Sequence, residues 1–198
     1  MSFSVRTENL DALFRERVRL GRLRDGGAKV IARAVSTLKR RLVPFAKRDI
    51  GAEYNLPSRE IGKRLRARGD ESSVTLTGIG RPQTLIKFGA RQNASGVAVQ
   101  VRRGQSLQID HAFVRVPAGA PSAGPQVLIR QDVTPQLPDD VNEIAVVDHN
   151  RHGYPIALLG GPGVADMLRD DARAKRIDDF AQKTFADEVD RLLELARG

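Results

Sequence analysis

Three histidines, His111, His149 and His152, are the residues of this 198-residue chain whose chemistry best suits proton transfer or metal binding. His149 and His152 form a His-x-x-His pair after Asp148, but such a pair normally needs a third ligand and a helix or strand that fixes it. His111 follows Asp110, yet a carboxylate beside a histidine makes no catalytic triad without a nucleophile in a defined turn. We therefore expect no catalytic residue, no metal site and no enzymatic activity.

The glycine-rich segment Gly160-Gly161-Pro162-Gly163 precedes an expected short helix, where helix N-termini can bind phosphate. It lacks the Gly-Lys-Ser/Thr ending of a P-loop and the Gly-x-Gly-x-x-Gly spacing of a dinucleotide-binding fold. We interpret it as a strand-to-helix turn in which glycine adopts conformations that other residues avoid. The sequence predicts no cofactor.

The composition excludes further classes of protein. The chain contains no Cys, so it forms no disulfide and holds no thiolate-bound zinc. Its longest apolar runs, such as residues 155–159, are far shorter than the roughly 20 residues that span a bilayer. Residues 1–10 lack the pattern of a secretory signal. We expect no contact with a membrane, and a protein that is made in a reducing cytoplasm.

The charge is unevenly distributed along the chain. Residues 1–69 contain 18 Lys and Arg against 7 Asp and Glu, a net charge of +11, whereas residues 139–198 have a net charge of −5 and the whole chain +9. Two explanations remain open: the basic part binds an acidic partner such as nucleic acid, or copies of the chain associate through unlike surfaces.

The elements that position the basic residues are expected to be helices. From residue 28 onward, apolar residues recur at steps of three and four, which is typical of one face of a helix. Lys29, Arg33, Arg40 and Lys47 fall on the opposite side, either as an interaction surface or as a solvated outer face. Pro44 removes a backbone donor, so we expect this helix to kink or restart there.

Two further helices are expected, one around residues 9–23 and one after Pro57, with Ser58 as its N-cap and Gly69 as its stop. Three basic residues would lie on one face of the second helix. Together with the first stripe they form the candidate interaction surface, which consists of Lys29, Arg33, Arg40, Lys47, Arg59, Lys63 and Arg66. Aromatic residues are too few for stacking on single strands, so non-specific attraction to phosphate is the nucleic-acid alternative.

The middle of the chain has the pattern of antiparallel strands. Short alternating apolar runs, separated by turn residues, begin at Val74, Leu85, Val97, Leu107 and Phe113, and residues 126–131 form another strand. Residues 117–125 and 132–153 contain Pro and Gly and are expected to be long exposed loops.

Two helices are expected at the end of the chain, one over residues 164–169 and one from about Ala174, with Ile177, Ala181 and Phe185 on its apolar stripe. The fold class is therefore α+β, a small antiparallel sheet flanked by N-terminal and C-terminal helices. We expect one compact domain with arms: a basic helical region at 1–69, a sheet core at 70–160 and a helical region at 161–198.

The order of short motifs resembles the minor tail protein Z family of tailed bacteriophages, also called tail completion proteins. The resemblance runs from the helix at Ala28 to Leu168. It is carried by Tyr54-Asn55-Leu56-Pro57, Phe88 with Arg91, Gly96-Val97-Ala98-Val99, Arg102 with Gly104, Ala112-Phe113, Val127-Leu128-Ile129-Arg130, Pro155-Ile156 and Gly161-Pro162-Gly163-Val164. Gly163 stands where the family usually has a serine.

The resemblance implies a non-enzymatic virion protein of the neck or tail that completes the tail and joins its head-proximal end to the head. It implies copies of the same chain in a six-fold ring, and tail terminator, tail tube or head–tail connector proteins as partners. Non-specific contact with genome DNA is also expected. The protein would reside in the virion after assembly in the host cytoplasm. The alternative is a basic nucleic-acid-binding protein without enzymatic activity.

Overall fold

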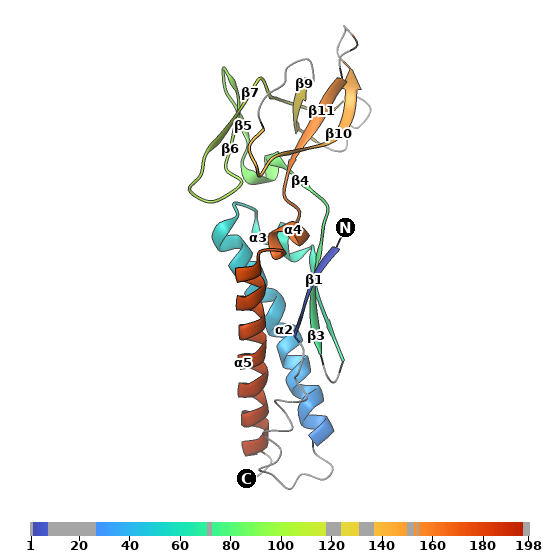
Figure 1. The fold of residues 1–198 in the computed structure, drawn as a ribbon, viewed down its shortest axis with the longest axis vertical. Helices are drawn as coiled ribbons and strands as arrows, with labels where there is room; N and C mark the ends of the chain where they lie inside the picture. Colours follow the sequence, from blue (N-terminus) through green and yellow to red (C-terminus); the bar gives the residue numbers. More distant parts are fainter. Residues whose placement is uncertain are drawn as a thin grey trace. The chain divides into compact units, whose positions relative to one another are not determined.

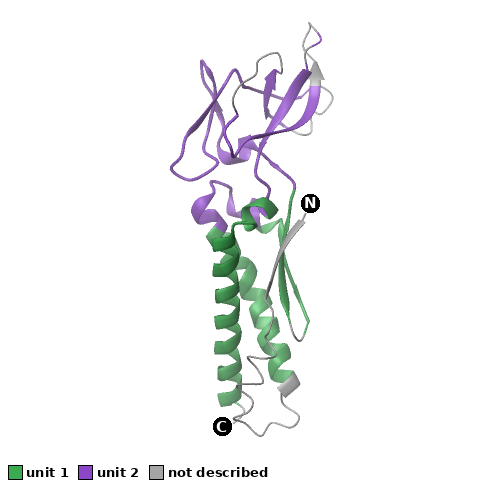
Figure 2. Cartoon of the chain, in the orientation of Figure 1, with its two compact units in different colours: residues 1–49, 62–80, 165–198 green, residues 50–61, 81–164 purple. Residues whose placement is uncertain are grey.

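The computed structural model of the chain describes residues 2–7, 27–70, 73–117, 124–130, 137–149, 153 and 155–195. These residues form two compact units, each assembled from separate stretches of sequence (Figure 2). Unit 1 comprises residues 1–49, 62–80 and 165–198, and unit 2 comprises residues 50–61 and 81–164. Each unit therefore combines residues from more than one of the three regions expected from the sequence.

Unit 1 contains a three-stranded antiparallel sheet, in the order β1-β3-β2. Its strands are β1 (Ser2–Thr7), β2 (Leu65–Gly69) and β3 (Val74–Ile79). Side chains alternate along β3, so that Val74, Leu76 and Gly78 are buried while Thr75 and Thr77 are partly exposed. The helices of the unit lie on one side of this sheet (Figure 1).

Two long helices of opposite direction lie side by side in unit 1 (Figure 1). Helix α2 (Gly27–Glu53) passes through Pro44 without interruption, so the expected restart there is wrong. Helix α5 (Asp171–Leu195) begins after Asp170, whose carboxylate accepts a hydrogen bond from the Arg173 backbone N–H at 2.7 Å and caps the first turn. The apolar stripes are confirmed as core: Leu38, Leu42, Ala46, Ile177, Ala181 and Phe185 are buried.

The short helix α4 (Val164–Leu168) confirms the sequence prediction and packs closely on the sheet. A Cβ atom on Gly78 would lie 2.8 Å from Leu168 Cδ1 and 3.1 Å from the Ala165 Cα atom. Glycine at this position of β3 therefore lets the helix backbone approach the strand.

Unit 2 contains two antiparallel sheets. One has the order β5-β6-β7, with β5 (Arg91–Gln92), β6 (Gly96–Val99) and β7 (Leu107–Asp110). The other has the order β10-β11-β9-β8, and β4 (Gln83–Thr84) also pairs with β11. Its remaining strands are β8 (Phe113–Arg115), β9 (Gln126–Arg130), β10 (Asn142–His149) and β11 (Pro155–Gly161). The α+β class, with antiparallel sheets and flanking helices, is confirmed, although the strands form three sheets and not one.

Three local expectations are wrong. Helix α3 spans only Ser58–Gly62, because Leu65–Gly69 is strand β2 and pairs with β3. Leu85–Phe88 is a 3-10 helix, η1, and not a strand; it ends at Gly89, whose φ of 77° lies in the left-handed region. Residues 142–149 form strand β10 within the stretch expected to be irregular.

Other expectations fall on residues outside those described. They are the helix around residues 9–23 and residues 118–123, 132–136 and 150–152 of the two expected loops.

Candidate functional site

The basic stripe of α2 lies on the outer side of the helix. Lys29, Arg33 and Arg40 are exposed and Lys47 is half-buried, on the face opposite the buried Leu38. Arg40 donates a hydrogen bond to Thr37 Oγ1 at 3.3 Å. Among the described residues, no carboxylate forms an ion pair with these four cations. The stripe is therefore a row of cations available to an external partner.

A cluster of charged side chains joins α2, near its C-terminal end at Asp49, to α5. Arg173 is fully buried and donates through Nε to Asp49 Oδ2 at 2.8 Å, and it also donates to the Met167 carbonyl oxygen. Arg176 donates to both oxygens of the same carboxylate, at 2.9 and 3.0 Å. Burial opposes ionisation of Asp49, but the hydrogen bonds from Arg176 and Arg173 outweigh it and hold its pKa below the ordinary value of 3.8. Asp49 therefore stays charged and joins the two helices.

Two more contacts fix the register of the helix pair. The rings of Phe45 and Phe180 stack with centroids 3.9 Å apart and planes 6° from parallel. Thr37 donates to Glu188 Oε1 at 3.3 Å, and Arg191 donates to both oxygens of that carboxylate. The hydrogen bonds from Arg191, against the opposing effect of burial, lower the Glu188 pKa. Glu188 and Arg191 therefore form their contacts within the unit.

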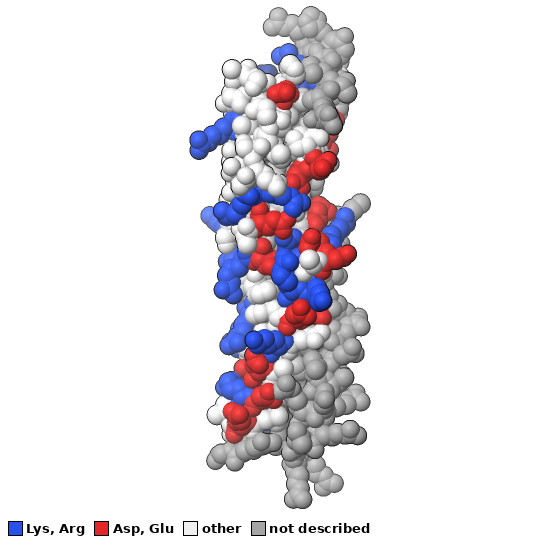
Figure 3. All heavy atoms as spheres, turned by 60° about the vertical axis from the view of Figure 1, so that its left-hand side comes forward, with Lys and Arg blue, Asp and Glu red and all other residues white. Residues whose placement is uncertain are grey.

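The exposed side of α5 carries a second charged row of opposite sign. Asp187, Asp190 and Glu194 are exposed, and their spacing of three and four residues places them on one face of the helix. Asp179 extends the same face towards the N-terminus of the helix, with Lys183 between. Figure 3 shows both signs of charge over the helical part of unit 1, with acidic side chains at its lower end.

The three remaining predicted surface residues are not brought together on one helix face, contrary to expectation. Arg59 is exposed on α3, Lys63 is exposed in the turn that follows, and Arg66 is exposed on β2. The prediction fails because the alternating pattern from Leu65 onward forms a strand, in which successive side chains point to opposite faces.

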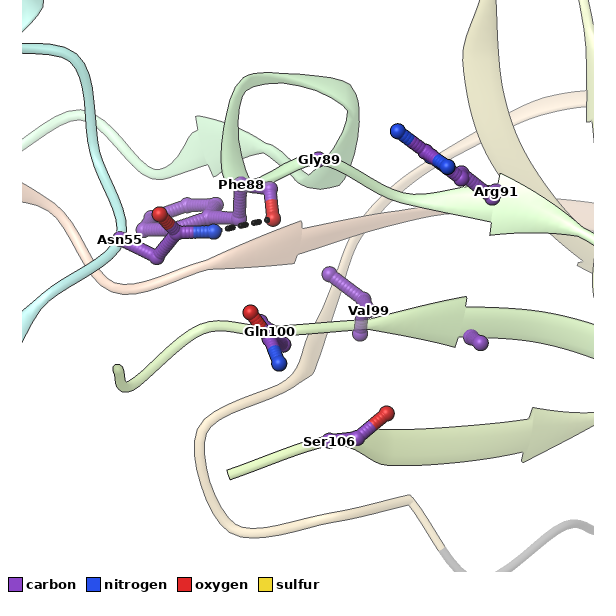
Figure 4. Close-up of a pocket in the computed structure, with 8 residues that line it drawn as sticks. Asn55, Phe88, Gly89, Arg91, Val99, Gln100 and Ser106 are labelled. Atoms are coloured by element: carbon purple, nitrogen blue, oxygen red, sulfur yellow. Dashed lines mark hydrogen bonds between the residues drawn. The ribbon is translucent and has the colours of Figure 1, made fainter. Parts of the chain in front are cut away.

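Unit 2 contains a shallow pocket of about 350 Å³. It is lined by Asn55, Phe88, Gly89, Arg91, Ala98, Val99, Gln100 and Ser106 (Figure 4). Asn55 Nδ2 donates to the Phe88 carbonyl oxygen at 3.1 Å, so this amide fixes the 3-10 turn. The exposed Arg91 is the one charged group among these lining residues. The pocket offers amide and hydroxyl groups, with no pair of side chains arranged for proton transfer.

A network of ion pairs holds the segments of unit 2 together. Arg102 pairs with Glu53 and with Asp140, and its guanidinium lies 5.1 Å from the centroid of the Tyr54 ring. The hydrogen bond that Arg102 donates to Asp140, against the opposing effect of burial, raises the Arg102 pKa. This network is structural, because each charge has its partner within the unit.

The described histidines and the glycine-rich segment lie in turns or at the ends of strands. His111 is exposed with a φ of 61° in the turn between β7 and β8, His149 ends β10, and His152 lies outside the described residues. Over the described ranges, no three His, Cys, Asp or Glu side chains are placed to hold a metal ion. Gly160 and Gly161 end strand β11, and Pro162-Gly163 connects it to α4, so the strand-to-helix connection is confirmed. The expected glycine conformations are wrong, because none of these three glycines has a positive φ. A Cβ on Gly161 would lie 2.7 Å from the Phe88 ring.

Sequence reasoning missed two features: the burial of Arg173 and the strand β10. A signal existed for Arg173, which lies four residues before Ile177 and so falls on the apolar stripe of α5.

Within the described residues, no helix is long and apolar enough to cross a membrane. No protein-family model, no curated protein and no solved structure matches the chain.

Proposed function

We propose that the chain is a non-enzymatic structural subunit of a phage neck or tail, which assembles into a ring that completes the tail and joins it to the head. The resemblance of the sequence motifs to tail completion proteins supports the viral role. The two charged rows of unit 1, one on α2 and one on α5, support assembly through unlike surfaces.

A ring requires heterologous contacts, in which one patch of a subunit meets a different patch of the next. The basic stripe of α2 and the acidic row of α5 are two such patches, because they carry opposite charges on different helices of the same unit. This pair of rows is the observation that carries the proposal.

The spacing of the charges also matches. Arg33 and Arg40 are seven residues apart on α2, as are Asp187 and Glu194 on α5. At 1.5 Å per residue, both separations are about 10.5 Å along the helix. Two ion pairs can therefore form at once when α2 of one copy lies along α5 of the next. Each exposed pair contributes little by itself, roughly 0.2–1 kcal/mol, so assembly needs several contacts together.

Strand β10 offers a second contact surface. Within the part of the chain that the structure describes, it pairs with β11 alone, and Ile144 and Val146 are 37% and 52% exposed. At the other end of the sheet, the Val114 backbone N–H of β8 donates to the Gln92 side chain at 2.9 Å, which caps part of that edge. An edge with open backbone groups and apolar side chains favours association with another chain.

The test is an exchange of charges between copies. The variant Arg33→Glu/Arg40→Glu should remain folded and lose assembly, and Asp187→Arg/Glu194→Arg should behave likewise. An equimolar mixture of the two variants should recover oligomers, measured by native mass spectrometry at low salt. Arg66→Glu/Arg68→Glu, which changes the charge equally at another place in unit 1, is the matched control and should assemble normally.

Assembly of the α2 variant at wild-type levels would refute the contact. Ring-sized oligomers that form equally in all variants would place the interface elsewhere. Absence of the polypeptide from purified particles of the parent virus would refute the viral role.

A further inference from the structure

The sheet of unit 1 has a face with regularly placed arginine and threonine side chains. Arg66 and Arg68 of β2 are exposed, whereas Leu65 is buried and Ala67 is half-buried. On β3, Thr77 is in register with Arg66, and Thr75 is in register with Arg68. Residues in register on neighbouring strands share a face, so these four side chains form two rows across the sheet.

None of the described helices covers this face. The opposite face carries the buried Val74, Leu76 and Gly78, and Gly78 is in close contact with α4. Figure 1 shows the helices of unit 1 on a single side of the sheet. The Arg/Thr face is therefore turned to solvent.

Strand β1 pairs with the other edge of β3, with Ser4 in register with Thr77 and Arg6 in register with Thr75. One row of the face contains Thr77 and Arg66, and the other contains Thr75 and Arg68. Strand geometry separates the rows by about 6.6 Å and neighbouring strands by about 4.8 Å.

The arginines of β2 retain their charge for an external partner. Arg66 donates to the Leu65 carbonyl oxygen at 2.8 Å, and no carboxylate of the described residues forms an ion pair with Arg66 or Arg68. The nearest carboxylate in sequence is Asp70, which accepts hydrogen bonds from the Ser73 backbone N–H and hydroxyl in the turn that joins β2 to β3.

We propose that this Arg/Thr face binds the phosphate backbone of double-stranded nucleic acid without sequence preference. Arginine and threonine are among the side chains that donate to phosphate oxygens. Single-stranded nucleic acid binds to aromatic side chains on which its bases stack, and none of these four residues of β2 and β3 is aromatic. The face is distinct from the α2 stripe to which we assign contacts between copies.

The test compares binding of the full chain to a fluorescent duplex of about 20 base pairs, by anisotropy, at concentrations where native mass spectrometry shows a monomer. The variant Arg66→Gln/Arg68→Gln removes two phosphate contacts. Each contact contributes about 0.9 to the slope of log K against log salt, so the slope should become shallower by about 1.8. At about 0.1 M salt this corresponds to a roughly 60-fold loss of affinity. Thr75→Val/Thr77→Val should weaken binding while leaving the salt slope unchanged.

The control is Arg33→Gln/Arg40→Gln, which removes the same charge from α2 of the same unit. The proposal expects this control to bind within a few-fold of the unmodified chain. Equal losses in the two arginine variants would overturn the proposal, because binding would then depend on net charge and not on the sheet face. Preference for a single strand, or competition by polyglutamate as strong as competition by unlabelled duplex, would also overturn it. Circular dichroism of each variant is the control for folding.

Discussion

The cluster of Asp49, Arg173 and Arg176 allows a sharp test of how unit 1 is held together. Asp49→Asn keeps the size of the side chain and removes its charge. Arg173 is fully buried and donates to Asp49 and to the Met167 carbonyl oxygen, so the substitution removes the negative charge of one partner of a buried cation. Loss of one partner of a buried ion pair costs about 3–5 kcal/mol. Asp49 is 15% exposed, and its hydrogen bonds with Arg176 also lose the carboxylate charge, so we expect about 3 kcal/mol.

The assay is urea unfolding followed by circular dichroism at 222 nm. With an m value of about 2 kcal/mol/M, the midpoint should fall by roughly 1.5 M. The matched control is Arg176→Gln. It removes hydrogen bonds to the same carboxylate, but Arg176 is 49% exposed, so it should cost about 0.2–1 kcal/mol.

A second substitution separates charge from packing. Asp49→Asn/Arg173→Met replaces the ion pair with two uncharged side chains, and it should recover part of the stability that Asp49→Asn loses, because no buried guanidinium remains at this position. The reasoning is refuted if Asp49→Asn costs no more than Arg176→Gln, or if the double variant is less stable than Asp49→Asn alone.

Three other predictions concern stability and association. The pKa of Glu188 is lowered from its ordinary 4.5, and that of Asp49 is lowered from 3.8. The stabilisation that these two carboxylates contribute is therefore present above pH 4.5 and should disappear as the pH falls through the lowered pKa values. Urea midpoints measured between about pH 6 and pH 2 check this, and an unchanged midpoint contradicts it. Gly78→Ala should lower the free energy of unfolding by about 1–3 kcal/mol, since the new Cβ would lie 3.1 Å from the Ala165 backbone. The control is Gly51→Ala, whose Cβ would lie an ordinary 3.7 Å from Ile61, and which should leave the stability unchanged or raise it. Val146→Lys on the edge strand should change stability by less than about 0.5 kcal/mol and reduce oligomer formation in native mass spectra; wild-type oligomers would exclude β10 from the contact.

Amphipathic helices could be predicted well because their pattern depends on one face of one element. The stripe through Leu38 and Leu42 places Arg33 and Arg40 outside without reference to the rest of the chain. The acidic row of α5 follows from the same periodicity.

Strand pairing could not be predicted in the same way, because it depends on partners that are distant in sequence. Ile61 and Leu65 have helical spacing, yet pairing with β3 makes Leu65–Gly69 a strand. The short run at Leu85 turns into a 3-10 helix, which Gly89 terminates. The apolar run from Ile144 to Val147 follows Pro135 and Pro138 in the chain, and these prolines favoured an irregular segment over strand β10.

The candidate site was predictable in part. The α2 stripe follows from spacing alone, but the Arg/Thr face requires the register of β2 against β3, which single-strand patterns do not contain. Arg173 illustrates the same limit, because its burial depends on the position of Asp49, 124 residues away in the chain.

Disulfide trapping can detect contact between α2 of one copy and α5 of the next, because the chain has no cysteine of its own. The single variant Arg40→Cys is mixed with Asp187→Cys in one reaction and with Glu194→Cys in another, under mild oxidation. We expect a cross-linked heterodimer in at least one of these mixtures, in excess of the homodimers that each variant forms alone. Homodimers only, or no cross-link in either mixture, would contradict it.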